Sequence, residues 1–321
     1  MKTGIQTKYI VDDRCPEQGF AMLSETGFSC ADFSLNAYLS NDSIYRMERN
    51  DFFGQPVKDL ERYFMRHKRG AKEAGVTISQ MHMPSPIYVP EGVAGGISEG
   101  RKEINDYLWN VVAPKSMELC HFLECPSIVV HGFKLAGLLG SEEAEWERTE
   151  AFIGFLAPMA RDMGITVCME NLFDRSDCGF VKGPACDMQK AVERIDRINE
   201  MFKAQVLGFC FDTGHANLAG IDPGHFVTGL GHRLKVLHLH DNDKTGDLHQ
   251  IPYTAATGKE NGEAVHWDSL IEGLRNIHFG GVLSFETAPA LCAFPEEIKR
   301  DVLRLIAGIG EYFSRRIEMG G

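Results

Sequence analysis

The sequence has no apolar run long enough to cross a lipid bilayer, and its first residues contain no apolar stretch of signal-peptide length. We therefore expect neither a membrane span nor a cleaved leader. A C-x-x-C pair is also missing, and the nine cysteines are dispersed without paired spacing, at positions 15, 30, 120, 125, 168, 178, 186, 210 and 292. This pattern favours reduced thiols in a cytoplasmic protein over a disulfide framework or a thiolate zinc site.

Positive charge is scarce. The chain carries 33 Lys and Arg against 45 Asp and Glu, a formal net charge of −12. A polyanion would be repelled at long range unless basic residues clustered on one surface. The short basic groups at 66–70 and 314–318 lie in helix-like segments and are interpreted as solvated faces. Nucleic acid is therefore not an expected partner.

No Pro/Ser linker or low-complexity tract divides the 321 residues, so one domain over 1–321 is expected. Short β-rich runs alternate with longer segments of helical period. The predicted strands are 3–9, 30–35, 76–82, 127–132, 165–170, 206–212, 234–240 and 281–286. The predicted helices are 15–25, 57–74, 100–123, 142–163, 187–202, 223–232, 266–277 and 295–317.

This alternation predicts an α/β fold. Continuous apolar runs indicate strands covered on both faces, as in a parallel sheet, and eight β-then-α units in order predict a closed (β/α)8 TIM barrel. An open, doubly wound sheet is the alternative. It would require a glycine-rich phosphate turn after the first strand, and "QTKYIVDDRCPEQG" has none.

Metal-competent side chains stand where the predicted strands end. In a parallel barrel these ends meet at one rim, so the side chains should lie close together. The strand ends supply His82, His131, Glu170, Asp212, His238 and Glu286, and the loops beyond add His215, Asp247 and His249. His240 is two residues past His238 and so on the same side of that strand. A single such residue is more often hydrogen-bonded to backbone, but so many converging ones would be costly to bury unpaired. Nitrogen and oxygen ligands together suit zinc, manganese, cobalt or iron, so we expect a metal site.

The motifs "MHMPSP", "VVHGF", "CMENLF", "CFDTGHAN", "LHLHDND", "GDLHQIP" and "LSFET" resemble the xylose isomerase-like TIM-barrel superfamily. Its branches include sugar phosphate isomerases and epimerases, inositol-catabolism enzymes and endonuclease IV. The epimerase branch implies a divalent ion (manganese, magnesium, cobalt or zinc) held by Glu170, Asp212, His238 and Glu286. The implied reaction is isomerisation or epimerisation of a sugar or sugar phosphate, through an enediolate that the metal stabilises. Glu170 and Glu286 would be its acid/base pair.

The resemblance leaves two other activities open. Endonuclease IV uses three zinc ions, and its pattern finds counterparts in His82, His131, Glu170, Asp212, His215, His238, Asp247, His249 and Glu286. Besides the four ligands of the epimerase-type site, a second metal or the substrate would be held by His82, His131, His215, Asp247 and His249. His240 would contact the substrate or support a ligand. The acidic balance favours sugar chemistry over this phosphodiesterase. An inositol-pathway dehydratase shares the proton abstraction, and a homo-oligomer fits the family.

Two long segments, 39–56 and 84–100, follow the second and third predicted strands. Aromatic residues and glycines in both segments suit a lid over the site. The same composition is equally typical of surface loops that pack on the barrel. Four basic residues could contact a phosphate or hydroxyl groups of the substrate: Lys134, Arg175, Lys244 and Lys259.

Overall fold

The computed structural model describes residues 1–90, 101–134, 142–255 and 264–319. Eight parallel strands form one sheet in the order β10-β1-β2-β3-β4-β5-β8-β9. A bridge from Leu239, next to β9, to Phe285 of β10 nearly closes the sheet into a barrel. The strands are β1 (Lys2–Gln6), β2 (Cys30–Ser34), β3 (Thr77–His82), β4 (Ser127–His131), β5 (Thr166–Glu170), β8 (Leu207–Asp212), β9 (Leu234–His238) and β10 (Val282–Phe285). This is the (β/α)8 TIM barrel that the alternation predicted.

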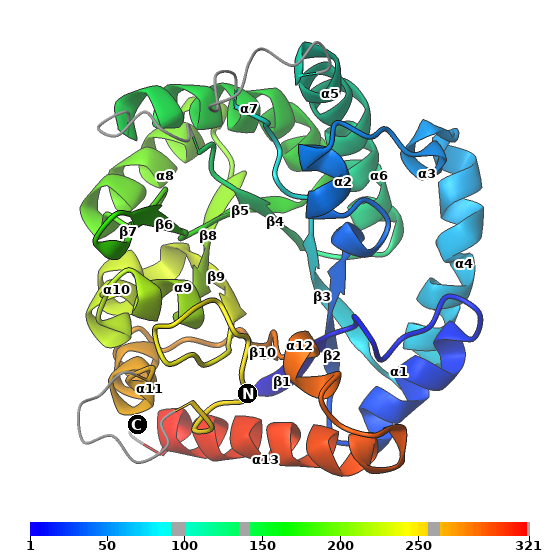
Figure 1. The fold of residues 1–321 in the computed structure, drawn as a ribbon, viewed down its shortest axis with the longest axis vertical. Coiled ribbons are helices and arrows are strands. Elements are labelled where there is room, and N and C mark those ends of the chain that lie inside the picture. The colour runs from blue at the N-terminus through cyan, green and yellow to red at the C-terminus, as the bar shows by residue number, and fades with distance from the viewer. Residues whose placement is uncertain (91–100, 135–141, 256–263, 320–321) are drawn as a thin grey trace.

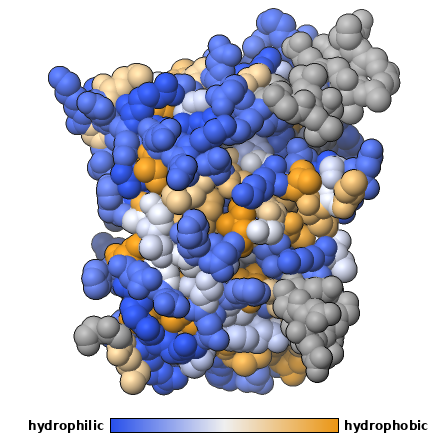
Figure 2. Space-filling model, turned by 90° about the vertical axis from the view of Figure 1, so that its left-hand side faces the viewer, coloured by the Kyte–Doolittle hydropathy of each residue, from blue (hydrophilic) through white to orange (hydrophobic). Residues whose placement is uncertain are grey.

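Helices form the outer ring of the barrel (Figure 1). Those that follow the strands are α1 (Pro16–Glu25), α4 (Val57–Ala74), α6 (Ala113–Phe122), α7 (Glu142–Met163), α8 (Met188–Phe202), α10 (Pro223–Leu230), α11 (Trp267–Asn276) and α13 (Lys299–Glu318). Each buries one stripe; on α4 this includes Leu60, Phe64 and Ala71. Helix α4 ends where Gly75 takes a left-handed conformation, at φ 69°. Hydrophilic residues cover most of the outer face in Figure 2, with apolar residues gathered in smaller patches at mid-height.

The strands are buried on both faces, since helices pack outside them and side chains fill the barrel inside. All residues of β2 and of β8 are buried. Because this burial takes every backbone polar group away from water, the ladder hydrogen bonds must satisfy them, and the continuous parallel pairing does so.

Several elements differ from the sequence prediction. The helix expected over 100–123 is divided into α5 (Arg101–Tyr107), a π-helical turn η2 (Leu108–Val112) and α6. Pro114 explains the division, because it cannot donate the backbone hydrogen bond that a continuous α-helix needs. The helix expected over 295–317 begins as the short 3-10 turn η4 (Glu296–Ile298). An antiparallel hairpin, β6 (Phe173–Ser176) with β7 (Gly179–Lys182), was not predicted.

The long segment 39–56 contains two short helices, α2 (Asn41–Tyr45) and α3 (Asp51–Gly54). Residues 91–100 of the other long segment lie outside the described part. All nine cysteines are free thiols, as their spacing predicted. Among the described residues, no helix is both long and apolar enough to cross a membrane.

Candidate metal centre at the barrel mouth

Four strand ends converge on one point. Glu170 ends β5, Asp212 ends β8, His238 ends β9 and Glu286 follows β10. One nitrogen or oxygen atom from each lies within 4.8 Å of the others. The parallel pairing of β5, β8 and β9 brings these ends to one rim: Asp212 pairs with His238 across β8 and β9. We call these four residues the quartet.

His238 stands at the middle of the quartet. Its Nδ1 lies 3.1 Å from Oε1 of Glu170, 3.1 Å from Oε2 of Glu286 and 4.0 Å from Oδ2 of Asp212. Glu170, Asp212 and His238 are almost fully buried, whereas the side chain of Glu286 keeps 14% of its surface exposed. The carboxylates therefore surround one imidazole nitrogen, and one of them opens toward solvent.

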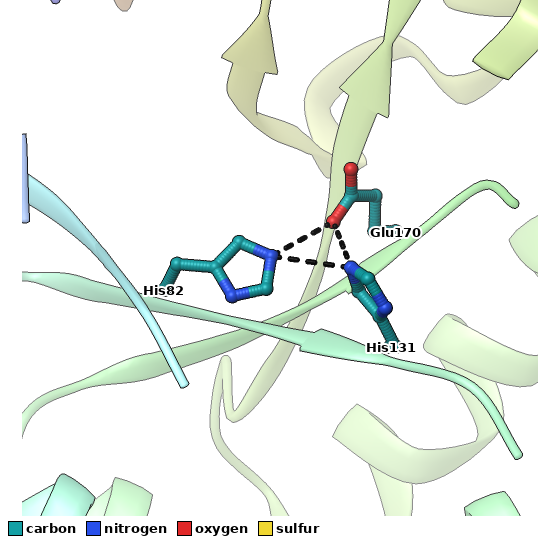
Figure 3. A group of neighbouring side chains, drawn as sticks. All are labelled: His82, His131 and Glu170. Carbon is teal, nitrogen blue, oxygen red and sulfur yellow. Dashed lines mark hydrogen bonds and ion pairs between the residues drawn. The ribbon is translucent and has the colours of Figure 1, made fainter. Parts of the chain in front are cut away.

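A second group shares Glu170 with the quartet. Nε2 of His82 lies 3.4 Å and Nε2 of His131 lies 3.1 Å from Oε2 of Glu170, and the two nitrogens are 3.2 Å apart. Figure 3 shows both rings pointing their nitrogens at the same carboxylate oxygen. Because Oε1 of Glu170 faces His238 and Oε2 faces this histidine pair, Glu170 has the geometry of a bridge between two cation positions.

A third group lies around Asp247. Its Oδ2 is 3.2 Å from Nε2 of His249 and 3.4 Å from Nε2 of His215. The rings of His240 and His249 stack with centroids 4.1 Å apart. His240 also contacts the quartet through Nε2, 2.9 Å from Oδ2 of Asp212. All ten predicted site residues therefore lie in one connected cluster.

Several buried polar atoms of this cluster make no hydrogen bond to any residue that the structure describes: Oε2 of Glu170, Nε2 of His238, Nδ1 of His240 and Oδ1 of Asp247. Each unsatisfied buried group costs on the order of 1–3 kcal/mol, and more when charged. A divalent cation would give the carboxylate oxygens a partner, and the nitrogen and oxygen donor set suits such an ion. The residues present thus fit a metal centre.

The pKa values show how strongly these groups act on one another. Burial by itself raises the pKa of Glu170, but the facing His238 and His131 lower it well below its usual range. Burial lowers the pKa of His249, whereas a hydrogen bond to Asp247 and the nearby Glu286 carboxylate raise it to about 9. For His131 burial prevails, so its pKa is lowered. The carboxylates therefore favour the protonated form of His249, whereas burial favours the neutral form of His131.

Sequence reasoning missed Asp32, which stands inside β2 and not at a strand end. The side chain is fully buried, its Oδ2 lies 3.5 Å from Nε2 of His238, and within the described part of the chain neither carboxylate oxygen has a hydrogen bond. Burial is the main reason that its pKa rises to about 6. A lone acidic residue in an apolar strand, in "CADFSL", was the available signal.

Three further neighbours were also missed. Gln6 ends β1, three residues before the predicted end of that strand at 9, and its Nε2 donates to Oε1 of Glu286 over 2.6 Å. Asn171 pairs with the backbone of Asp212 through both polar atoms, at 2.9 and 2.8 Å. The sulfur of Cys210 belongs to a possible metal group with Glu170 and His238, but burial raises the pKa of its thiol, which disfavours the thiolate.

Two adjoining cavities open over the cluster. The first, about 340 Å³, is lined mainly by polar residues, among them Gln6, His82, Glu170 and Glu286. The second, about 630 Å³, has more apolar walls and includes Lys134 and Arg175. Of the other basic residues considered, Lys244 lines a separate pocket beside α10, and Lys259 lies outside the described residues.

A family model described as xylose isomerase-like TIM barrel matches residues 47–306. The chain belongs to the xylose isomerase-like TIM barrel family. It is 26% identical over 190 residues to an uncharacterised protein of Methanocaldococcus jannaschii, a match of 57% of this chain and 58% of that protein. The aligned region thus spans little more than half of that relative.

Solved structures of xylose isomerase-like barrels resemble this chain over nearly its whole length. A D-tagatose 3-epimerase-like protein is 19% identical with a TM-score of 0.62, covering 97% of this chain and 99% of that one. A D-psicose 3-epimerase from Clostridium cellulolyticum H10, solved with D-tagatose, is 13% identical with a TM-score of 0.65, covering 98% and 99%. The 3-keto-D-glucoside 4-epimerase of E. coli is 15% identical with a TM-score of 0.60, covering 96% and 99%. At these identities the likeness shows the fold, and the three neighbours are named as sugar epimerases or epimerase-like.

Proposed function

We propose that this protein is a divalent-metal-dependent sugar isomerase or epimerase, with the quartet as its metal site. The observation that carries the proposal is the placement of Glu170 and Glu286 on either side of one imidazole nitrogen, each 3.1 Å from Nδ1 of His238. Moving a proton at a carbon next to a carbonyl needs a base, an acid and stabilisation of the oxygen that gains charge. Two carboxylates facing one small polar cavity supply the first two.

The chain's own residues have distinct tasks in this scheme. Glu170, Asp212, His238 and Glu286 would hold the ion, which when bound supplies Lewis-acid stabilisation of negative charge on sugar oxygens. Glu286, the more exposed glutamate, takes up or returns a proton at the cavity surface, and the hydrogen bond from Gln6 orients its carboxylate. Glu170 serves the opposite side of the substrate. Because its surroundings are buried, water competes poorly for the proton.

A second candidate function is a multi-zinc phosphodiesterase. The observation in its favour is the pair of extra ligand groups, His82 with His131 and Asp247 with His249, which lie next to the quartet. Clustered zinc ions would generate hydroxide and receive the leaving oxygen. The net charge of −12 is unfavourable for binding a nucleic acid backbone. About three zinc ions per chain together with nicking of abasic duplex DNA would favour this candidate over the epimerase.

The proposed function is tested by solvent-hydrogen exchange. The metal-loaded protein is incubated in D2O with a panel of ketoses and ketose phosphates, and deuterium at carbon is followed by mass spectrometry. Glu170→Gln and Glu286→Gln should keep the fold and lose exchange by about 10²–10⁴-fold, the range of general acid/base catalysis. Glu272→Gln, on the exposed face of α11, is the matched control and should exchange as the wild type does. Unchanged exchange in both site variants would refute the mechanism, and a product lighter by one water would indicate a dehydratase.

A further inference from the structure

The larger of the two cavities over the cluster is not needed for the proton transfer. It measures about 630 Å³ and shares the lining residues Asn41, Ser85, His131, His215 and Asp247 with the smaller cavity. It therefore extends from the histidine side of the cluster, while Gln6, Glu170 and Glu286 line only the smaller one. A substrate whose reacting carbon lies beside the two glutamates has room to continue into it. We call it the outer compartment.

Three basic side chains line the outer compartment: Arg101, Lys134 and Arg175. In the described part of the chain, none of them has a carboxylate oxygen within 4.0 Å. The half-buried Lys134 ammonium donates to the backbone oxygen of Phe173 and lies 5.1 Å from the centroid of that ring. Its charge is therefore held by a carbonyl and an aromatic face, without an anion.

The two arginines are also incompletely satisfied. Nη1 of Arg101 donates to the backbone oxygen of Pro90 over 2.9 Å, but its Nε is buried without an acceptor among the described residues. The guanidinium of Arg175 lies over the ring of Phe180, with its Cζ 5.0 Å from the centroid. Guanidinium groups bind phosphates and carboxylates through paired N–H donors, and these donors remain available.

The acidic residues on the same walls do not neutralise this set. Asp247 is engaged by His215 and His249, at 3.4 and 3.2 Å. Asp174 accepts the backbone N–H of Arg175 over 2.8 Å and acts on Lys134 only from beyond ion-pair distance. A positive region in a protein of net charge −12 is thus preserved beside the site.

We propose that the outer compartment binds an anionic group of the substrate, a phosphate ester or a carboxylate, so that the protein acts on acidic sugars in preference to neutral ones. This inference rests on the proposed function. Lys134 and Arg175 contact the anion, and aromatic side chains such as Tyr45 and Phe173 cover the carbon skeleton between the anion and the reacting centre. The apolar walls strengthen each charge–charge contact, because they exclude water from around it.

Anion binding is tested first without turnover. Metal-free protein is titrated with inorganic phosphate and separately with acetate by calorimetry. The wild type should bind one of them, and Lys134→Met and Arg175→Met should each weaken that binding at least ten-fold. Lys244→Met, which alters a basic residue of a separate pocket, should bind as the wild type does. Stronger binding of phosphate assigns a phosphate ester, and stronger binding of acetate assigns a carboxylate. The inference is overturned if neither ion binds, or if both variants bind as tightly as the wild type.

Turnover supplies the second test. The exchange assay is run on neutral ketoses, ketose phosphates and keto sugar acids. An acidic sugar should exceed its neutral counterpart at least 100-fold in kcat/KM. Lys134→Met should remove this preference, chiefly through KM, whereas Lys244→Met should keep it. Equal turnover of neutral and acidic sugars overturns the inference but leaves the proposed function standing. No exchange with any sugar refutes the proposed function, and the phosphate titration then decides the anion site by itself. Because Arg175 is exposed, its variant keeps the tests decisive even if Lys134→Met fails to fold.

Discussion

Oδ2 of Asp32 lies 3.5 Å from Nε2 of His238, on the opposite side of the imidazole ring from Glu170 and Glu286. The ring therefore lies between the Asp32 carboxylate at Nε2 and the carboxylates of Glu170 and Glu286 at Nδ1. A histidine that binds a metal commonly gives its other nitrogen to a carboxylate, which fixes both the tautomer and the ring orientation. Asp32 occupies the position that this arrangement requires.

Replacement of Asp32 by Asn should weaken divalent-metal binding by about 10–100-fold, because a neutral amide holds the His238 ring and its tautomer less firmly than a carboxylate. Competition with a chromogenic chelator measures the affinity, and circular dichroism checks the fold. Asp177→Asn, at an exposed position in the turn of the β6–β7 hairpin, should leave the affinity unchanged. Equal metal affinity in the wild type and the Asp32 variant would show that Asp32 does not contribute to ion binding.

Gly214→Ala should disturb the cluster from outside the quartet. Gly214 lies in α9 (Thr213–Leu218), and a Cβ there would stand 2.0 Å from Cε1 of His240. The ring would have to move and lose its 2.9 Å contact with Asp212. We expect a loss of about 1–3 kcal/mol in the free energy of unfolding, as for other overpacked sites.

Urea unfolding measures this loss, and α7 offers a matched control. A Cβ at Gly154, inside that helix, meets no heavy atom within 4 Å. Gly154→Ala should therefore stabilise the protein by roughly 0.5–1 kcal/mol, because glycine is unfavourable in a helix interior. If the two alanine variants changed stability alike, the close approach of Gly214 to His240 would not matter.

Acid should destabilise the protein partly through Asp13. Its Oδ1 accepts from the hydroxyl of Tyr38 over 2.6 Å and lies 2.9 Å from Nε2 of His67. Burial by itself raises the pKa of Asp13, but these hydrogen bonds outweigh it and lower the pKa below its ordinary value of 3.8. The folded pKa is below the unfolded one, so this stabilisation is complete above the unfolded pKa and is lost as pH falls through the folded pKa.

The difference in unfolding free energy between the wild type and Asp13→Asn should accordingly shrink as the pH is lowered from about 6 toward 3. Urea titrations of both proteins at several pH values give this difference, under conditions where folding is reversible. A difference that stayed constant over the range would show that the Asp13 carboxylate titrates alike in the folded and unfolded chains.

Much of the barrel could be predicted because its elements are specified locally. The helix 57–74 begins and ends where it was predicted, and the strand ends at His82, Glu170 and Asp212 match the structure. The division of the helix 100–123 was missed, since the effect of Pro114 on a long helix depends on how the neighbouring turns can widen. The hairpin β6–β7 was missed because its two strands have only four residues each, too few to show a clear two-residue alternation.

The sequence by itself determined the alternating order of strands and helices and the residue types at the strand ends, because apolar periodicity and turn residues act over a few neighbouring positions. Only the tertiary structure decided which atoms face each other: that Glu170 divides its two oxygens between His238 and the pair His82 and His131, and that Asp32 stands behind the ring of His238. These contacts join residues far apart in the chain. Their geometry follows from the register, tilt and closure of the whole sheet, which no short stretch of sequence encodes.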